Sequence, residues 1–367
     1  MHQMVTNLFA RRYFMASATA TVLTMSLPIW GKQRPAFLSC AKAPDGAFLA
    51  CGLSESGDLL FKSPLPGRGH ELIYHPEIPV AVAFGRRPGF YASVIDSTTG
   101  EVLDCINSSA GCHFYGHGVF SSDGRHLYTS ENDYNNATGI IGVWSVFPFR
   151  RLGELSVGGI GPHDICISPD NGDLLIANGG LETHPSTGRH ILNAHDFTSN
   201  ITRLNVTGKI KCVWELEPHQ RMLSIRHLSV GANNVLAFAA QNQDTEVIQL
   251  AGIASHSGLL SMLETPKPAL QKLRGYVSSI ALNNSQSQLA ITSSRGGIVQ
   301  IYDTETLHLI QNSANEDISG IAPSNLGGFI ATNGFGAVFH ITDDKTEKIA
   351  HHNLTWDNHL VAFSSFG

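Results

Sequence analysis

The sequence has few charged residues and no basic cluster. Lys and Arg total 24 and Asp and Glu total 30 among 367 residues, so charged residues make up only 15% and the formal net charge is −6. Because nucleic-acid binding requires clustered Lys and Arg to neutralise phosphates, we exclude a nucleic-acid partner. The low charge and the 42% of hydrophobic residues also argue against extended disorder and indicate a large folded core.

The uncharged stretch at the N-terminus is too short to span a membrane comfortably. It runs from Ala16 to Trp30, 15 residues, which suits the apolar region of a signal peptide. Arg11-Arg12 precede it in an order that resembles a twin-arginine export signal. We therefore predict an export signal and linker at 1–35, a periplasmic location, and no stable membrane insertion after signal removal. An ordinary secretory signal is the alternative.

Short motifs of common metal and catalytic sites are also missing. The six cysteines include no Cys-x-x-Cys pair and no Cys-x-x-Cys-His haem-attachment site. The chain has no Gly-x-Ser-x-Gly nucleophile elbow. Any functional site must therefore be assembled from residues that are distant in sequence.

Cysteines in an exported chain can form disulfides. Cys40 and Cys51 are symmetric about Asp45-Gly46, so a two-residue hairpin turn there would place them opposite each other. Cys105 and Cys112 close a short polar segment. We predict these two bridges, and six free, mostly buried thiols are the alternative.

Glycine is abundant, with 36 residues, which suits many tight turns. A recurring pattern joins an apolar run, a polar turn and a second apolar run. Clear copies lie at 43–50, 119–130, 166–178 and 280–292, a weaker copy lies at 321–332, and degenerate copies begin near Val80 and Leu228. The copies are anchored at Lys42, Phe84, Phe120, Ile167, Val230, Leu282 and Ala322, at intervals of 42, 36, 47, 63, 52 and 40 residues.

These intervals are typical of β-propeller blades, which contain four short strands in about 40–50 residues. We therefore predict an all-β fold, a seven-bladed β-propeller of four-stranded antiparallel blades, in a single domain at 36–367. The last strand, around 359–363, should complete the blade that begins near Ala36, because this closure removes free sheet edges.

Three histidines stand at equivalent places in three successive copies. His117, His163 and His227 each precede an anchor by three or four residues, at the start of an expected innermost strand. They should converge near the axis of the ring, where they are candidate ligands for a transition metal. Alternatively, each ring hydrogen-bonds a backbone group of the next blade and has only a structural role.

Further polar residues fall in connections that share this face of a propeller. Glu131 or Asp133 could add an oxygen ligand to a metal. The remaining candidate ligand-binding residues are Asn132, Asn178, His184, Arg189, Arg226 and Arg295.

Several motifs resemble those of a family of uncharacterised exported bacterial β-propellers, domain of unknown function number fifteen-thirteen, which is related in shape to YVTN and quinoprotein-dehydrogenase-like propellers. The matching segments include Gly116-His117-Gly118, Gly161-Pro162-His163-Asp164, Leu223 to Leu228, and Ser294-Arg295-Gly296-Gly297. The resemblance covers most of the mature chain. It implies periplasmic residence and an association with periplasmic iron-uptake proteins.

Three functions are compatible with these features. The first is a periplasmic binding or accessory protein whose His- and Arg-rich face engages a metal, a small ligand or a protein partner, with iron handling as the specific hypothesis. The second is an oxidoreductase or lyase with a histidine as general base and Arg226 or Arg295 holding an anionic substrate. The third is an interaction scaffold. We expect a monomer, and the sequence leaves catalysis undecided.

Overall fold

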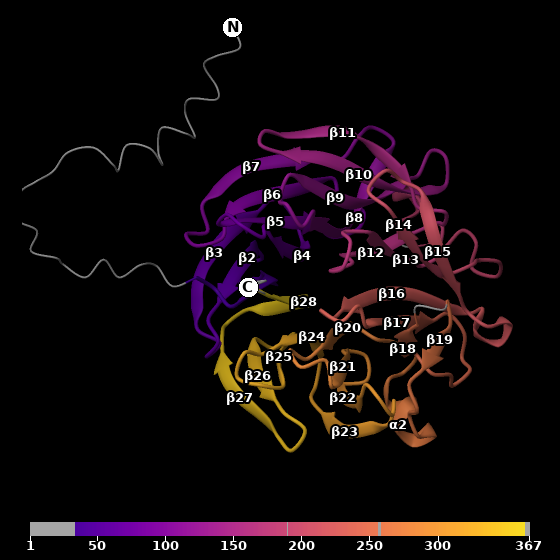
Figure 1. Ribbon diagram of the computed structural model, residues 1–367. Coiled ribbons are helices and arrows are strands. Elements are labelled where there is room, and N and C mark those ends of the chain that lie inside the picture. The colour runs from indigo at the N-terminus through magenta and orange to yellow at the C-terminus, as the bar shows by residue number, and fades with distance from the viewer. Residues whose placement is uncertain (1–33, 189, 256–257, 364–367) are drawn as a thin grey trace, which may run out of the picture. The chain divides into compact units, whose positions relative to one another are not determined.

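Seven sheets of four antiparallel strands are arranged in a ring around a common centre, which we call the channel (Figure 1). The computed structural model describes residues 34–188, 190–255 and 258–363. The innermost strand of each sheet contacts the innermost strands of its neighbours around the ring. The predicted all-β, seven-bladed propeller is therefore confirmed.

Each blade runs from an innermost strand at the channel to an outermost strand at the rim. In this order, the first three blades contain β28 (Thr355–Ala362), β1 (Phe37–Lys42), β2 (Phe48–Leu53) and β3 (Leu59–Leu65); β4 (Gly69–Tyr74), β5 (Val80–Gly85), β6 (Tyr91–Asp96) and β7 (Val102–Asn107); β8 (Cys112–Phe120), β9 (His126–Asp133), β10 (Thr138–Val146) and β11 (Phe149–Ser156). The fourth and fifth contain β12 (Pro162–Ile167), β13 (Leu174–Asn178), β14 (Asn200–Leu204) and β15 (Ile210–Glu215); β16 (Leu223–Val230), β17 (Leu236–Asn242), β18 (Ala251–Ala254) and β19 (Leu260–Met262). The last two contain β20 (Ser279–Leu282), β21 (Gln288–Ser293), β22 (Ile298–Asp303) and β23 (Leu309–Ala314); β24 (Ile318–Pro323), β25 (Phe329–Asn333), β26 (Ala337–Ile341) and β27 (Thr346–His351). Short helices η1 (Pro185–Thr187), η2 (Pro218–Gln220) and α2 (Lys267–Lys272) lie in connections.

The outermost strand of each blade is the least buried, and this explains the sequence pattern. In the second blade every residue of β5 is buried, whereas in β7 only Ile106 is.

The polar turns that separate the apolar runs are held by side-chain hydrogen bonds and by glycine. At 121–124, Ser121 Oγ donates to Asp123 Oδ1 at 2.6 Å and Gly124 adopts a φ of 66°, which a residue with a Cβ rarely does.

The ring is closed by the C-terminal strand. β28 pairs antiparallel with β1, so the first blade takes its innermost strand from the other end of the chain. The predicted pairing of the last strand is therefore confirmed. The anchors Lys42 and Phe84 lie on β1 and β5, which are second strands, whereas the other five anchors lie on innermost strands. The innermost strand β4 begins Gly-His-Glu and lacks the long apolar run of the other copies.

Neither predicted disulfide is present, and the six cysteines are free thiols. The turn between β1 and β2 has three residues, Pro44 to Gly46, closed by the Ala43–Ala47 backbone pair. This extra residue shifts the register, so Cys51 lies opposite Ser39, and Cys40 faces the other side of the sheet. Cys105 and Cys112 are separated because Cys105 lies on β7, the outermost strand of its blade, and Cys112 lies on β8, the innermost strand of the next.

The predicted export signal at 1–35 lies outside the described residues apart from Arg34 and Pro35 and stays a prediction. Within the described ranges, no helix has the length and apolar character needed to cross a bilayer.

Candidate metal centre in the central channel

Five histidines from five successive innermost strands converge in the channel. They are His359 on β28, His70 on β4, His117 on β8, His163 on β12 and His227 on β16. Adjacent ring centroids are 4.5 Å apart for His359–His70, 4.8 Å for His70–His117 and for His117–His163, and 5.0 Å for His163–His227 and for His227–His359. We call these five residues the channel histidines.

Each channel histidine lies at or beside an irregularity in its strand. The ladder register shifts between Gly69 and Leu72 in β4, between Phe114 and Gly118 in β8, between Pro162 and Asp164 in β12, and between Ile225 and His227 in β16, and a similar shift occurs where β28 meets β1. A bulge bends a strand and re-aims a side chain. These bulges explain why five strands can direct an imidazole to one place, whereas β20 has a regular ladder and places no histidine there.

One nitrogen of every channel histidine has no hydrogen-bond partner although it is buried. These atoms are Nδ1 of His70, His163 and His227, and Nε2 of His117 and His359. A purely structural role would require each ring to hydrogen-bond a backbone group of the next blade. Across the described ranges, none of the five rings hydrogen-bonds a backbone carbonyl. Donor atoms lie within 4.8 Å of one another in the sets His70–His117–His163 and His117–His227–His359. Unpartnered imidazole nitrogens at such distances are suited to metal ligation.

Burial keeps four of these rings neutral near pH 7. It lowers the pKa of His70 to about 3 despite the nearby Asp357 carboxylate. Burial also lowers the pKa of His163 and His359 well below the usual value, and the charge of Arg226 adds to the effect at His163. The pKa of His227 is lowered in the same way, by burial and then by His117. Neutral imidazole is the form that binds metal.

His117 differs because two carboxylates approach it. Its Nδ1 lies 3.0 Å from Glu71 Oε2 and 3.6 Å from Asp164 Oδ1. Burial alone would lower the pKa of His117, but these two carboxylates outweigh it and raise the pKa. Asp164 is held by backbone N–H donors of Leu228, at 2.9 Å, and Ile165, at 2.8 Å. Glu71, His117 and Asp164 thus form a third set of possible ligands that shares His117 with the other two.

A family profile described as "Protein of unknown function (DUF1513)" matches residues 63–363. The chain belongs to the DUF1513 family. This confirms the resemblance inferred from the sequence motifs. All five channel histidines of this DUF1513 protein lie in the matched segment. A comparison with curated proteins gave no match.

Sequence reasoning found three of the five channel histidines in the DUF1513 protein. The structure brings His117, His163 and His227 together as expected, with Arg226 beside them. His70 and His359 were missed because β4 and β28 were not recognised as innermost strands. Placing the second anchor on the Leu-Ile-Tyr end of β4 would have revealed His70 at the equivalent position.

The expected oxygen ligand Glu131 is not in the channel centre. Its side chain is fully buried in the third blade, where both carboxylate oxygens accept from Arg151 Nη1 at 2.8 and 2.9 Å. Thr129 Oγ1 also donates to it at 2.6 Å. Burial raises the pKa of Glu131 and Arg151 opposes this rise. Glu131 is therefore part of a structural ion pair, and the carboxylates beside the channel histidines are Glu71, Asp164 and Asp357.

Replacing Arg151 by Met should reduce the free energy of unfolding by about 3 kcal/mol, because it leaves a buried carboxylate without its cation. Urea unfolding monitored by fluorescence would measure the loss. The control is Arg150→Met, since Arg150 is the exposed neighbour on β11. Equal stability of the two variants would contradict the structural role of the pair.

The other predicted ligand residues of the DUF1513 protein are dispersed. Asp133 caps the turn that follows β9 by accepting from Asn136, and Asn132 Nδ2 donates to the Thr183 carbonyl at 3.0 Å. Asn178 bonds within its own blade, His184 caps η1, and Arg295 stacks on the Tyr276 ring at 4.3 Å. Arg189 lies outside the described residues. None of those described belongs to the three candidate ligand sets.

The bulge in β8 determines which of its two histidines, His113 or His117, faces the channel. It lies four residues before His117, a spacing that would put both side chains on one face of a regular strand. The register shift between Phe114 and Gly118 separates them. His113 Nε2 instead meets Asn132 Nδ2 at 3.1 Å and its ring stacks near Tyr134.

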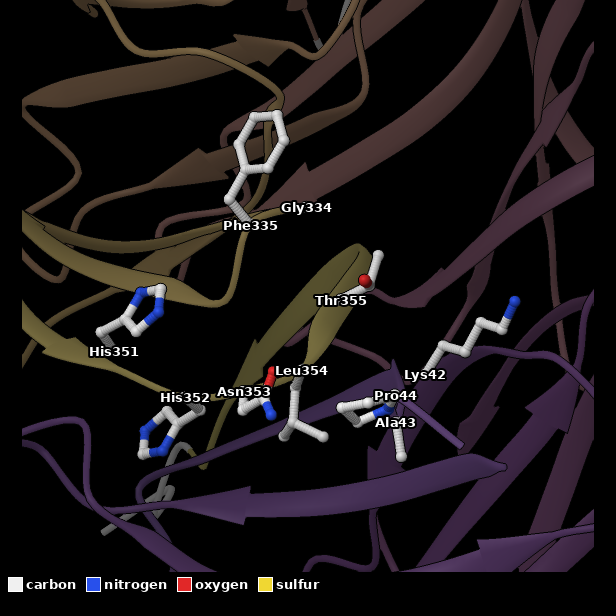
Figure 2. A pocket seen from close by; sticks show the side chains of 10 residues that line it. All are labelled: Lys42, Ala43, Pro44, Gly334, Phe335, His351, His352, Asn353, Leu354 and Thr355. Carbon is white, nitrogen blue, oxygen red and sulfur yellow. The ribbon is translucent and has the colours of Figure 1, made fainter. Parts of the chain in front are cut away.

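A surface hollow lies where the last blade meets the first (Figure 2). Its lining includes His351, His352, Phe335 and Lys42. His352 Nε2 already pairs with the Gly57 carbonyl at 2.8 Å, and neither histidine belongs to a candidate ligand set of the described residues. We therefore assign the candidate site of the DUF1513 protein to the channel histidines.

Proposed function

We propose that this protein is a periplasmic metal-binding protein that holds a divalent first-row transition metal in its propeller channel. The observation that carries the proposal is the convergence of five imidazoles, each with a buried and unpartnered nitrogen, from five separate blades. Buried polar atoms without partners are costly, so a cluster of them needs a reason. A metal ion would satisfy several of these nitrogens at once.

The donor set supports this class of metal. Imidazole suits Fe, Cu, Ni and Zn, and carboxylates extend the range to harder ions. His117 would be the central ligand, because it belongs to all three sets, with Glu71 and Asp164 on its other side. His117 Nε2 remains available for an ion because Nδ1 faces Glu71. Iron is our specific hypothesis, which rests on the mixed nitrogen and oxygen donors and on the association with iron uptake that the family resemblance implies.

The periplasmic location rests on the N-terminal sequence alone. Arg11-Arg12 before an uncharged stretch fit export by the twin-arginine route. This route carries folded proteins, so the metal could be loaded before export.

The test is metal analysis of protein recovered from the periplasmic fraction of its native host, with competition titrations of the metal-free protein against Fe(II), Co(II) and Zn(II). We expect the wild-type protein to contain metal. His117→Ala and the double variant His163→Ala/His227→Ala should each weaken binding by at least about 100-fold, because they remove ligands rather than their supporting partners.

The matched control is His113→Ala, which removes a buried histidine from the same strand as His117 without touching the cluster. It should leave metal affinity unchanged. Thermal melting of the metal-free variants separates ligand loss from misfolding. Wild-type protein that binds none of these ions, or folded cluster variants that bind them as tightly as the wild type, would refute the proposal.

A further inference from the structure

Two neighbouring arginines, one of them beside the channel histidines, lack a negatively charged partner. Arg226 on β16 is only 6% exposed, and its Nε has no hydrogen-bond partner. Arg87, in the connection between β5 and β6, has an unpartnered buried Nη1. Neither forms an ion pair within the part of the chain that the structure describes. Other half-buried arginines are neutralised: Arg151 binds Glu131 and Arg203 binds Asp173.

Two buried hydroxyl groups near these arginines are also unpartnered. They are Tyr115 Oη and Thr183 Oγ1, and the two residues are 1% and 4% exposed. The guanidinium carbon of Arg87 lies 5.8 Å from the centroid of the Tyr115 ring. Burial raises the pKa of Tyr115 and the nearby Glu182 carboxylate adds to the rise, whereas Arg87, Arg226 and the Thr183 hydroxyl act to lower it.

Two glycines lie alongside Tyr115 and Arg226. Gly179 N donates to the Gly161 carbonyl at 2.8 Å. A Cβ on Gly161 would lie 3.5 Å from Tyr115 Oη, and one on Gly179 would lie 3.4 Å from Arg226 Cζ. The hydroxyl and the guanidinium therefore approach two backbone segments that are hydrogen-bonded to each other.

These groups share one chemical property, because all of them can donate hydrogen bonds to an anion. Guanidinium groups match planar and tetrahedral oxyanions, and hydroxyl donors complement them. Unpaired buried cations are costly, and two of them near each other repel, so this arrangement is unfavourable without a ligand. Burial, and then the charge of Arg87, lower the pKa of Arg226 to about 10, which reflects that cost.

We propose that Arg87, Arg226, Tyr115 and Thr183 form a binding site for a small oxyanion, a carboxylate or a phosphate, next to the channel histidines. The site is distinct from the metal centre in its residues, but Arg226 precedes His227 directly in the chain. An anion held there would therefore attract a metal ion bound by the histidines. This second part rests on the proposed metal-binding function, whereas the anion site itself does not.

The experiment titrates metal-free protein with malonate and with phosphate by isothermal calorimetry, and follows melting in the same solutions. We expect saturable binding of at least one anion, and comparison of the two affinities identifies the ligand as carboxylate or phosphate. Arg226→Gln should weaken binding at least tenfold and Tyr115→Phe by a smaller factor. Without anion, Arg226→Gln should melt at a higher temperature than the wild type, because a buried unpaired charge has been removed.

Arg295→Gln is the control, since Arg295 is a cation already stacked on Tyr276, and it should leave anion affinity unchanged. Absence of binding for both anions, or equal affinity in wild type and Arg226→Gln, would overturn the anion site. A repeat with saturating Zn(II) tests the link to the metal. We expect anion affinity to rise at least tenfold, with the same factor for metal affinity in the presence of anion. An unchanged anion affinity would refute the link while leaving the anion site intact.

Discussion

Deleting residues 353–367 should prevent the protein from forming a stable propeller. The deletion removes β28, the innermost strand of the first blade, and with it Trp356 and Leu360, which are 3% and 4% exposed. Loss of one buried aromatic and one buried aliphatic side chain costs about 5–10 kcal/mol together, which equals the whole stability of a typical domain. The deletion also removes Asp357, the partner of Arg68 and Arg86.

Circular dichroism and proteolysis of the truncated protein would measure this effect. The control deletes only 364–367 and leaves β28 intact; it should fold normally. A synthetic peptide spanning 353–367, added during refolding, should restore protease resistance if β28 acts by pairing with β1. A truncated protein that melts as cooperatively as the control, without peptide, would show that closure by β28 contributes little.

Acid should destabilise the metal-free protein at a pH where most domains are stable. The pKa values of His70, His163, His227 and His359 are all lowered by burial, and that of His70 is about 3. Unfolded histidines titrate near pH 6.5, so below this pH the unfolded chain binds more protons than the folded one. Stability is therefore retained above about pH 6.5 and is lost as the pH falls from 6.5 toward 3.

The size of this effect depends on all the charged groups that face the cluster. Each of the four histidines costs up to about 1.4 kcal/mol per pH unit in this range. Asp164 partly offsets the loss, because burial raises its pKa and the folded state gains a proton there as the pH falls. His117 opposes the loss as well, since its raised pKa favours the folded state below pH 6.5. Arg226 stays charged and disfavours protonation of its neighbours.

Urea unfolding at several pH values between 7 and 5, with a chelator present, would give the proton uptake from the slope of stability against pH. We expect uptake of two or more protons in wild type. Replacing His163 by Gln should reduce it by up to one proton, whereas His308→Gln, a change at an exposed residue, should leave it unaltered. A slope near zero in wild type would contradict the buried neutral state of the cluster.

The fold was predictable because its signals are local. Turns such as Ser121 to Gly124 fix the strand boundaries by side-chain hydrogen bonds within a few residues, and seven such units give the number of blades. The position of each strand within a blade was harder to predict, because the innermost strand of the first blade comes from the far end of the chain. The disulfide prediction failed for a similar reason, since a single residue in the Pro44–Gly46 turn decides which face Cys40 occupies.

The candidate site was only partly predictable because bulges determine where its side chains point. Alternation along a regular strand does not place His163 or His227, since each lies at a register shift. Glu131 shows the opposite error. It was expected beside the histidines because its position in the sequence falls on the same face of the propeller, but its side chain points into the blade toward Arg151. Glu71 could not be identified because it depends on recognising β4 as an innermost strand.

The position of His359 on β28 has a consequence for biosynthesis. Translation releases the C-terminal strand from the ribosome after every other blade has emerged, and His359 lies within a strand that ends at Ala362. The set His117–His227–His359 can therefore form only after the strands of the other six blades have been translated, whereas the histidines of β4, β8 and β12 can meet earlier. A chain that stops before β28 would lack a complete ligand cluster, so full metal loading would report that β28 had completed the ring.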